Sequence, residues 1–284
     1  MTVYFVDGRF TERDGLNISI DDRGYYFGDG VYEVIKVYDG ELYTAEEHIN
    51  RLFQSAAKIK MSIPYAEVQL MEIARELVAT NNILIGHVYI QVTRGSAPRL
   101  HQFPNPAVSP VVTAYAINNP RPIAGMEKGV AVKSVEDVRW LRCDIKSLNL
   151  LGNVLAKQEA QEAGCIEALL HRDGIVTEGS ASNMFGVKDG TVYTHPVTNL
   201  ILNGITRQVI LGLCSEQGIP LIEKSFTLEE AFEMDEFFLT STTSEVTPVI
   251  SIDGRSLGTG VPGSVTKKIQ KAFNLQIPSF IAGE

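Results

Sequence analysis

The sequence has few cysteines, no excess of basic residues and no long apolar run, and each absence narrows the class of protein. Its three cysteines, Cys143, Cys165 and Cys214, are widely spaced, which favours reduced thiols in a cytoplasmic protein. The formal net charge is −9, so neither nucleic acid nor an anionic membrane surface is an expected partner. No stretch approaches the roughly 18 apolar residues of a membrane helix. We also expect no signal peptide, because the first residues lack a basic segment and a cleavage site.

The common metal and nucleotide motifs are missing too. The five histidines show no metal-ligand spacing, so no metal site is expected. Neither a P-loop nor the G-x-S-x-G motif of hydrolases occurs. The segment from Gly258 to Gly263 matches G-x-G-x-x-G, but it contains Pro262 and no strand–helix unit follows it. We interpret this segment as a surface turn.

Strand and helix patterns alternate along the chain, which predicts a mixed α/β (α+β) protein with two domains. At 284 residues, the sequence is longer than a typical domain of about 100–200 residues. Two prolines in Asn118-Asn119-Pro120-Arg121-Pro122 restrict the backbone and predict a linker. We therefore expect an N-terminal α/β domain over residues 1–117, a linker over 118–122, and a C-terminal α/β domain over 123–284.

Three turn and helix signals are local. Arg172-Asp173-Gly174 and Lys188-Asp189-Gly190 each predict the turn of a hairpin, and Thr227-Leu228-Glu229-Glu230 predicts a capping box.

Two further local predictions depend on helix signals. Thr44 and Glu47 have the spacing of a capping box, which predicts that the Thr44 side chain caps the following helix. A second helix is predicted over residues 147–163, ending at Gly164. Its apolar residues recur with helical spacing, and the face expected to be buried consists of Leu148, Leu151, Val154 and Leu155.

The residues most informative about chemistry are Lys146, in Lys-Ser-Leu-Asn, and Glu178, in Thr-Glu-Gly. A lysine amine can form a Schiff base with the aldehyde of pyridoxal phosphate, and a carboxylate can keep the pyridine nitrogen protonated. A protonated ring is a better sink for the carbanion formed when a substrate loses its α proton. The pair therefore indicates a pyridoxal phosphate enzyme, although a surface lysine and a turn glutamate are the ordinary alternative.

Three segments have the residue types that bind a phosphate group. Gly204-Ile205-Thr206 offers amides and a hydroxyl at a predicted helix start, where the helix dipole favours an anion. Ser241 and Thr242 belong to a run of hydroxyl residues after an apolar strand. Arg51, on the first long predicted helix, can supply a guanidinium. Each segment alone has a structural explanation, and their occurrence together with Lys146 and Glu178 favours a phosphate site.

Taken together, these segments resemble the fold-type IV pyridoxal phosphate-dependent aminotransferases, and within them the D-amino acid transaminases. The resemblance runs nearly end to end, and the segments that carry it are residues 22–33, 47–52, 92–95, 144–149, 177–179, 204–207 and 240–242. Most of them are shared with branched-chain aminotransferases and aminodeoxychorismate lyases. The discriminating segment is Pro98-Arg99-Leu100-His101, an Arg-x-His that follows Thr93-Arg94-Gly95.

The resemblance implies a role for each of these residues. Lys146 would be the catalytic Schiff-base lysine, and Glu178 would hold the pyridine nitrogen of the cofactor. The phosphate ligands would be Arg51, Ile205, Thr206, Ser241 and Thr242. The substrate carboxylate would be bound by Tyr32, Arg99 and His101. Ala181 stands where the family often has a serine, so a hydrogen bond from that hydroxyl is lost.

The resemblance also implies an activity and an architecture. Pyridoxal 5′-phosphate would lie between two α/β domains of a homodimer that transaminates D-amino acids with 2-oxo acids by a ping-pong mechanism. D-Alanine and 2-oxoglutarate would give pyruvate and D-glutamate. Two alternatives stay open on the same scaffold. A branched-chain L-amino acid aminotransferase would want a more apolar pocket than Arg99 and His101 provide, and an aminodeoxychorismate lyase would not need the Arg-x-His.

Overall fold

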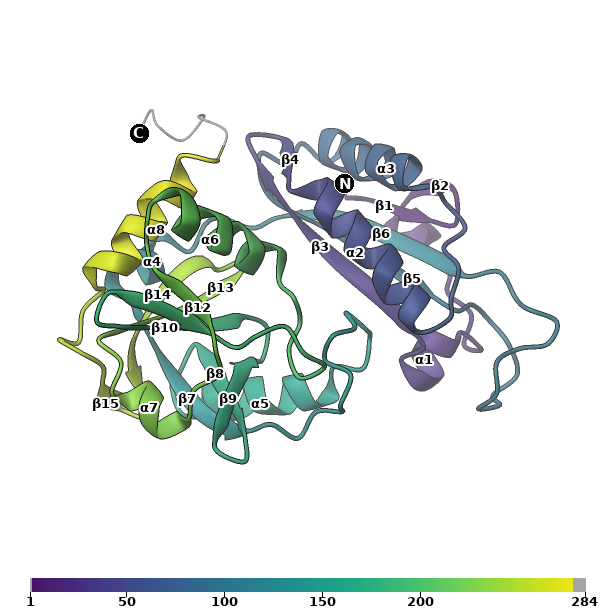
Figure 1. The fold of residues 1–284 in the computed structure, drawn as a ribbon. Helices are drawn as coiled ribbons and strands as arrows, with labels where there is room; N and C mark the ends of the chain where they lie inside the picture. The colour runs from purple at the N-terminus through teal and green to yellow at the C-terminus, as the bar shows by residue number, and fades with distance from the viewer. Residues whose placement is uncertain (1, 278–284) are drawn as a thin grey trace. The chain divides into compact units, whose positions relative to one another are not determined.

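The computed structural model describes residues 2–277, which form two compact units. The first unit holds the described residues up to Pro120 together with Ile145–Asn149, and the second holds Arg121–Asp144 and Leu150–Ile277. Each unit contains a sheet and helices (Figure 1), which confirms the predicted mixed α/β fold. The boundaries predicted for the domains stay a prediction. Residues Ile145–Asn149 pack with the first unit although the predicted boundaries assign them to the C-terminal domain.

The first unit is built on a six-stranded antiparallel sheet with the order β2-β1-β6-β5-β3-β4. Its strands are β1 (Val3–Val6), β2 (Arg9–Glu12), β3 (Gly30–Tyr38), β4 (Glu41–Tyr43), β5 (Ile85–Thr93) and β6 (Val111–Asn118). Its helices are the 3₁₀ turn η1 (Arg13–Gly15), α1 (Arg23–Phe27), α2 (Ala45–Lys58) and α3 (Glu67–Thr80). Alternate residues of β5, namely Val88, Ile90 and Val92, are fully buried in a core shared with α2 and α3.

The second unit contains a nine-stranded mixed sheet, in which β15 pairs only with β14 and the other strands follow the order β12-β11-β10-β13-β14-β7-β8-β9. Its first strands are β7 (Val130–Glu136), β8 (Glu167–Arg172), β9 (Ile175–Gly179), β10 (Asn183–Lys188) and β11 (Thr191–Thr194). Its later strands are β12 (Leu221–Glu223), β13 (Glu236–Ser241), β14 (Glu245–Ile252) and β15 (Arg255–Ser256). Its helices are α4 (Ile123–Lys128), α5 (Leu151–Glu162), α6 (Ile205–Glu216), α7 (Leu228–Phe232) and α8 (Ser264–Asn274).

Short turns with aspartate and glycine set the register of several hairpins. Asp173 and Gly174 join β8 to β9, and Asp189 and Gly190 join β10 to β11. All four residues have positive φ, a conformation that glycine adopts freely and aspartate tolerates. The hairpins predicted at these two turns are confirmed, and the second of them places Asn183 at the start of an inner strand of the sheet.

The predicted side-chain cap at Thr44 is wrong. Helix α2 does begin directly after Thr44, but the Thr44 hydroxyl donates to the carbonyl of Tyr43 at 2.8 Å. Thr44 has a φ of 50°, in the left-handed region, because the chain turns tightly from β4 into the helix. A capping residue normally has extended backbone. Thr227 has that geometry, and it forms the predicted capping box with Glu230 at the start of α7.

The prediction for residues 147–163 is wrong about the start of the helix and about its buried face. Helix α5 begins at Leu151, because Ser147 forms a bridge with Val31 and Leu148 donates to the carbonyl of Gly30. The expected inner residues Leu151, Val154 and Leu155 are 72%, 58% and 57% exposed. The helix instead buries its small residues, Ala156 and Ala160, against β7 and β8.

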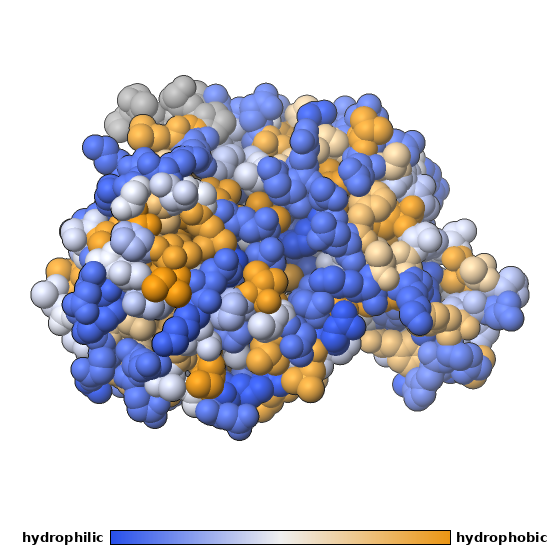
Figure 2. All heavy atoms as spheres, in the orientation of Figure 1, coloured by the Kyte–Doolittle hydropathy of each residue, from blue (hydrophilic) through white to orange (hydrophobic). Residues whose placement is uncertain are grey.

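The surface of the described chain is chemically mixed. On the face drawn in Figure 2, hydrophilic residues are interspersed with smaller hydrophobic patches. None of the helices in residues 2–277 is long and apolar enough to cross a membrane. The cysteines Cys143, Cys165 and Cys214 are all free.

The core of the first unit supports a test of stability with a matched control. Leu77 of α3 is fully buried, whereas Leu84, just before β5, is 55% exposed. We predict that Leu77→Ala lowers the free energy of unfolding by about 2–5 kcal/mol, because it removes buried methyl groups and leaves a cavity. Leu84→Ala should change it by less than about 1 kcal/mol. Denaturant unfolding of both variants measures the difference, and equal effects would contradict the described packing of α3.

Candidate active site

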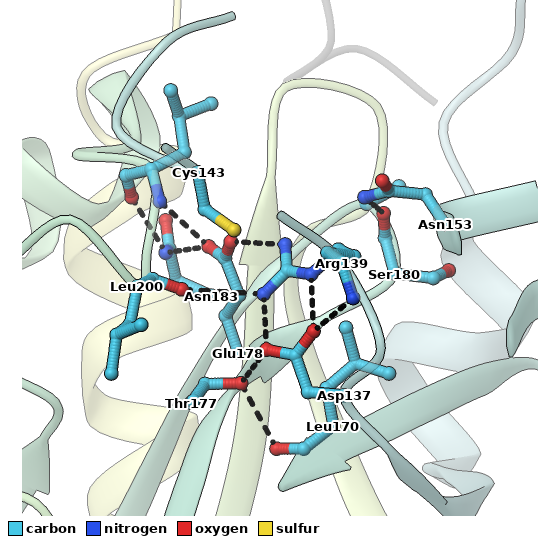
Figure 3. A network of polar contacts seen from close by, with 12 residues as sticks. Asp137, Arg139, Cys143, Asn153, Leu170, Thr177, Glu178, Ser180, Asn183 and Leu200 are labelled. Carbon is cyan, nitrogen blue, oxygen red and sulfur yellow. Dashed lines mark hydrogen bonds and ion pairs between the residues drawn. The ribbon is translucent and has the colours of Figure 1, made fainter. Parts of the chain in front are cut away.

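Glu178 ends in a carboxylate that is buried and fully engaged. It lies on β9, and its Oε1 accepts from Arg139 Nη1 at 2.7 Å. Its Oε2 accepts from Asn183 Nδ2 at 3.0 Å and from the backbone N–H of Leu202 at 3.0 Å. Figure 3 shows Arg139, from a loop, and Asn183, from β10, pointing at this carboxylate. Leu202 lies in the segment before α6. The carboxylate is therefore held in one orientation by three separate segments of the chain.

Arg139 is held in turn by Asp137. Two of its nitrogens, Nε and Nη2, donate to the two carboxylate oxygens of Asp137, each at 2.9 Å. Thr177 Oγ1 also donates to Asp137, at 3.0 Å (Figure 3). Burial disfavours the charged form of Asp137, but the hydrogen bonds and charge of Arg139 outweigh it, and the pKa of Asp137 is lowered. A paired arginine thus faces Glu178 with its orientation already fixed.

Opposing effects act on the pKa of Glu178. Burial raises the pKa of its carboxyl from 4.5 to about 7, although Arg139 and the N–H of Leu202 act in the opposite direction. Such a group exchanges a proton near neutral pH, which is unusual for a glutamate and typical of functional sites. The carboxyl can therefore share a proton with a basic nitrogen of a ligand.

The start of helix α6, in the same unit, has donors of the kind that bind an anion. Gly204 precedes the helix, and no side chain caps the first turn, so the amides of Ile205 and Thr206 have no side-chain acceptor. These amides and the Thr206 hydroxyl are the donors that bind phosphate at helix starts. A Cβ at Gly204 would lie 2.2 Å from Asn183 Oδ1, so only glycine allows this close approach.

The hydroxyl residues at the end of β13 lie on the same side as the start of α6. Thr240 is the cross-strand partner of Asn183, which in turn contacts Gly204. Ser241 ends the strand and accepts from the Ser244 N–H, and Thr242 follows in the turn. The Thr240 hydroxyl is buried and has no hydrogen-bond partner among residues 2–277. This Thr240 hydroxyl and the amides at the start of α6 are donors that a bound phosphate would fit.

A residue that donates to Glu178 lies close in the sequence to the start of α6. Leu202 donates to Glu178, and Ile205 begins the helix three residues later. Three residues span at most about 10 Å, a length that one pyridine ring with a phosphate arm can bridge. The predicted residues Glu178, Ile205 and Thr206 thus lie near one another in the second unit, which also contains Ser241 and Thr242.

Lys146 lies in the first unit and presents an amine. Its carbonyl accepts from the N–H of Tyr32 at 3.0 Å, and its own N–H donates to Ser55 Oγ at 3.3 Å. Its Nζ lies 4.4 Å from the centre of the Tyr32 ring. Within the described chain this amine makes no hydrogen bond or ion pair with a protein acceptor. It is therefore available to react with a carbonyl group.

Arg51 shares this neighbourhood with Lys146. Its Nε and Nη2 donate to the two oxygens of buried Glu33 at 2.6 and 2.9 Å, and His48 Nδ1 lies 2.7 Å from the same carboxylate. Burial opposes ionisation of Glu33, but the charges of Arg51 and His48 outweigh it and lower its pKa. Burial lowers the pKa of His48, and the positive charges of Arg51 and Lys146 act in the same direction.

Arg99 and His101 lie on the exposed loop between β5 and β6. Both side chains contact the ring of Phe27, Arg99 with its Cζ at 5.1 Å and His101 with its ring centre at 5.6 Å. No hydrogen bond or ring contact joins either of them to Tyr32 within the part of the chain that the structure describes. The structure therefore groups Arg99 with His101, and Tyr32 with Lys146.

The residues that hold the predicted side chains in place were not predicted. Asp137, Arg139 and Asn183 position Glu178, and Glu33 and His48 position Arg51. Asn183 occurs in the Gly-Ser-Ala-Ser-Asn segment that follows Glu178, so its proximity was a usable signal. Asp137 and Arg139 have no comparable signal, because Glu178 lies 39 residues after Arg139 in the sequence.

The chain is similar to known aminotransferases along almost its whole length. The sequence model of the family Amino-transferase class IV matches residues 30–252. A D-alanine aminotransferase of Staphylococcus haemolyticus is 50% identical over 279 residues, covering 98% of this chain and 99% of the relative. One from Bacillus licheniformis is 51% identical and covers 98% of both.

Solved structures with the same fold include branched-chain enzymes. The branched-chain amino acid aminotransferase of Escherichia coli has a TM-score of 0.92 and 28% identity, covering 97% of this chain and 94% of that chain. The T.th. branched-chain amino acid aminotransferase with pyridoxamine 5′-phosphate has a TM-score of 0.90 and 28% identity, covering 96% of this chain and 92% of that chain. The D-alanine aminotransferases are therefore much more similar in sequence than these structures are.

The raised pKa of Glu178 predicts a pH dependence of stability in the cofactor-free protein. The folded chain binds the Glu178 proton more tightly than the unfolded chain, so this contribution is present below pH 4.5 and is lost as the pH rises to about 7. The loss amounts to on the order of 3 kcal/mol, at about 1.4 kcal/mol per pKa unit. Glu178→Gln cannot titrate. The unfolding free energy of the wild type minus that of Glu178→Gln should therefore fall between pH 4.5 and 7, and parallel pH profiles would contradict this.

Proposed function

Because the chain belongs to the class IV aminotransferases, we propose that it transfers the amino group of D-amino acids to 2-oxo acids. D-Alanine and 2-oxoglutarate are the proposed pair, with pyruvate and D-glutamate as products. The observation that carries the proposal is the near-complete match, at about half of all positions, to D-alanine aminotransferases. The branched-chain enzymes share the fold at 28% identity, which makes that activity the second candidate.

Pyridoxal 5′-phosphate is the cofactor of this enzyme, and when bound it supplies an electron sink for the charge left on the substrate Cα. Lys146 is proposed to hold it covalently through the amine that lies over Tyr32. Once displaced by substrate, the same amine moves a proton at the substrate Cα. Arg51, Ile205, Thr206, Ser241 and Thr242 are proposed to bind its phosphate.

Glu178 is proposed to hold the proton on the pyridine nitrogen. A carboxyl with a pKa of about 7 can share a proton with that nitrogen near neutral pH. Arg139, Asn183 and Leu202 keep the carboxylate in one orientation, so no side-chain reorganisation is needed during the reaction. In this proposal Lys146 and Glu178 serve the same cofactor molecule.

Arg99, His101 and Tyr32 are proposed to bind the substrate carboxylate. Fixing the carboxylate determines which face of the Cα presents its hydrogen to Lys146, so these residues would select the D-enantiomer. A branched-chain L-amino acid aminotransferase would want a more apolar pocket on the side of the substrate carboxylate. The presence of Arg99 and His101 on one loop therefore supports D-amino acids over branched-chain L-amino acids.

The chain is proposed to act as a cytoplasmic homodimer. Leu151, Val154 and Leu155 form an exposed apolar face at successive turns of α5, which a second copy could cover. The free state of Cys143, Cys165 and Cys214 is consistent with a reducing compartment. A binding role alone would not require a free lysine amine and an engaged carboxylate.

The proposed activity and its lysine can be tested together. Purified protein with 2-oxoglutarate should convert D-alanine at least about 100-fold faster than L-alanine or L-leucine, a difference of about 3 kcal/mol in transition-state binding. Borohydride reduction followed by peptide mapping should find the cofactor on Lys146. Lys146→Ala should lose turnover, and Lys188→Ala, which removes an exposed lysine that pairs with Asp235, should not. A preference for L-leucine would move the chain to the branched-chain activity.

The dimer has a separate test. Leu155→Arg places a charge on the exposed apolar face of α5 and should lower the proportion of dimer, because an unpaired charge is costly in a buried interface. The mass in solution, measured by light scattering after gel filtration, reports the change. Glu72→Arg, at an exposed position of α3, is the control. An equal proportion of dimer in both variants would exclude this face as the interface.

A further inference from the structure

The loop that carries Arg99 and His101 has little structure of its own. Residues 94–110 join β5 to β6, and they contain no helix or strand beyond an isolated bridge from Ser96 to Asp22. We call residues 96–106 the carboxylate loop. Its residues 98–103 are exposed, so few apolar contacts hold them in place. Side chains on such a segment bind a ligand with defined geometry only if the backbone is fixed by other means.

Arg23 supplies that restraint from helix α1. Its Nη1 donates to the carbonyl of Leu100 at 2.6 Å and to that of Gln102 at 3.3 Å, and its Nη2 approaches the carbonyl of His101 at 3.4 Å. The three carbonyls are consecutive, and they surround the Cα of His101. The Arg23 side chain is only 3% exposed, so these bonds are shielded from water.

A second arginine and one carboxylate keep Arg23 in place. Asp29 Oδ2 accepts from Arg23 Nε and from Arg94 Nε, both at 2.8 Å. Arg94 also donates to the carbonyls of Ile59 and Lys60 just after α2, and its Cζ lies 3.8 Å from the centre of the Phe103 ring. The carboxylate loop is therefore restrained at residues 100–102 and again at Phe103.

The ring of Phe27 connects the restraint to the functional side chains. Arg23 Cζ lies 4.9 Å from the centre of this ring, and Arg99 Cζ and the His101 ring contact the same ring. A change at Arg23 therefore acts on both the backbone and the side-chain contacts of the loop.

We propose that Arg23, held by Asp29, is a positioning residue that fixes the carboxylate loop for recognition of the substrate carboxylate. The proposal rests on the proposed function of Arg99 and His101. A lysine cannot replace Arg23, because one ammonium lacks the planar fork that reaches several carbonyls. Loss of the fork should weaken carboxylate binding and leave the cofactor and Lys146 unaffected.

The experiment compares Arg23→Lys with the wild type on two amines. D-Alanine has a carboxylate and ethylamine does not, and single-turnover absorbance of the bound cofactor follows the half-reaction of each. We expect kcat/KM for D-alanine to fall by ~10- to 100-fold, the effect of losing charge-assisted hydrogen bonds, mainly through KM. The ethylamine rate and the absorbance of the bound cofactor should change little, and the thermal midpoint should fall because buried hydrogen bonds of Arg23 are lost.

Asn81→Ala is the matched structural control. Asn81 joins α3 to β1 through hydrogen bonds with the backbone of Val3, in the same unit and away from the carboxylate loop. This variant should lower the thermal midpoint and leave the ratio of the D-alanine rate to the ethylamine rate unchanged. If Arg23→Lys lowers both rates equally, its role is structural and the proposal is wrong.

A double-mutant cycle with Arg99→Ala tests whether Arg23 acts through the loop. If it does, Arg23→Lys adds little loss to Arg99→Ala, whereas independent losses would multiply and overturn the proposal. An unchanged Arg23→Lys beside a defective Arg99→Ala overturns this proposal alone. An Arg99→Ala variant with wild-type activity overturns the proposed role of the loop itself. If Arg23→Lys does not fold, the same rates are measured for Asp29→Asn. This variant removes the charge that holds Arg23 and keeps Arg23 itself, and the same results support or overturn the proposal.

Discussion

Buried carboxylates matched by arginines hold the functional side chains of this chain in place. Glu178 faces Arg139, Glu33 faces Arg51, and Asp29 faces both Arg23 and Arg94. An unmatched charge in these positions would cost several kcal/mol, so each pair favours the fold in which it forms. The consequence is that the orientations needed for binding are already set in the folded protein.

The pairs differ in whether the carboxyl can still exchange a proton near neutral pH. Asp137 occupies two nitrogens of Arg139, and the third donates to Glu178, whose pKa remains near neutral. Glu33 is held in the charged form by Arg51 and His48, so it does not exchange protons in the same range. One unit thus contains a carboxyl that can share a proton, and the other contains one that only orients an arginine.

Much of the fold could be predicted from local signals, and the errors have physical causes. The Asp-Gly turns and the capping box at Thr227 are local, and both were confirmed. The prediction for α5 failed because the helix packs through Ala156 and Ala160, whose small size lets it approach β7 and β8 closely. Hydrophobicity alone favoured Leu151, Val154 and Leu155, which are exposed. Thr44 failed because a left-handed backbone turns its hydroxyl away from the helix.

The site was predictable where a residue bears the chemistry itself, and not where it acts through another. Lys146 and Glu178 stand in short motifs, whereas the groups that Arg139 and Arg23 position, Glu178 and the backbone at Leu100, lie far along the chain from them. The contrast among the cations supports this division. Arg23, Arg51 and Arg139 are each bound to a carboxylate, and the Lys146 amine makes no such bond among residues 2–277. In the proposed mechanism, the arginines that orient other groups are paired with carboxylates, whereas Lys146, whose proposed chemistry requires a free amine, has no carboxylate partner among the described residues.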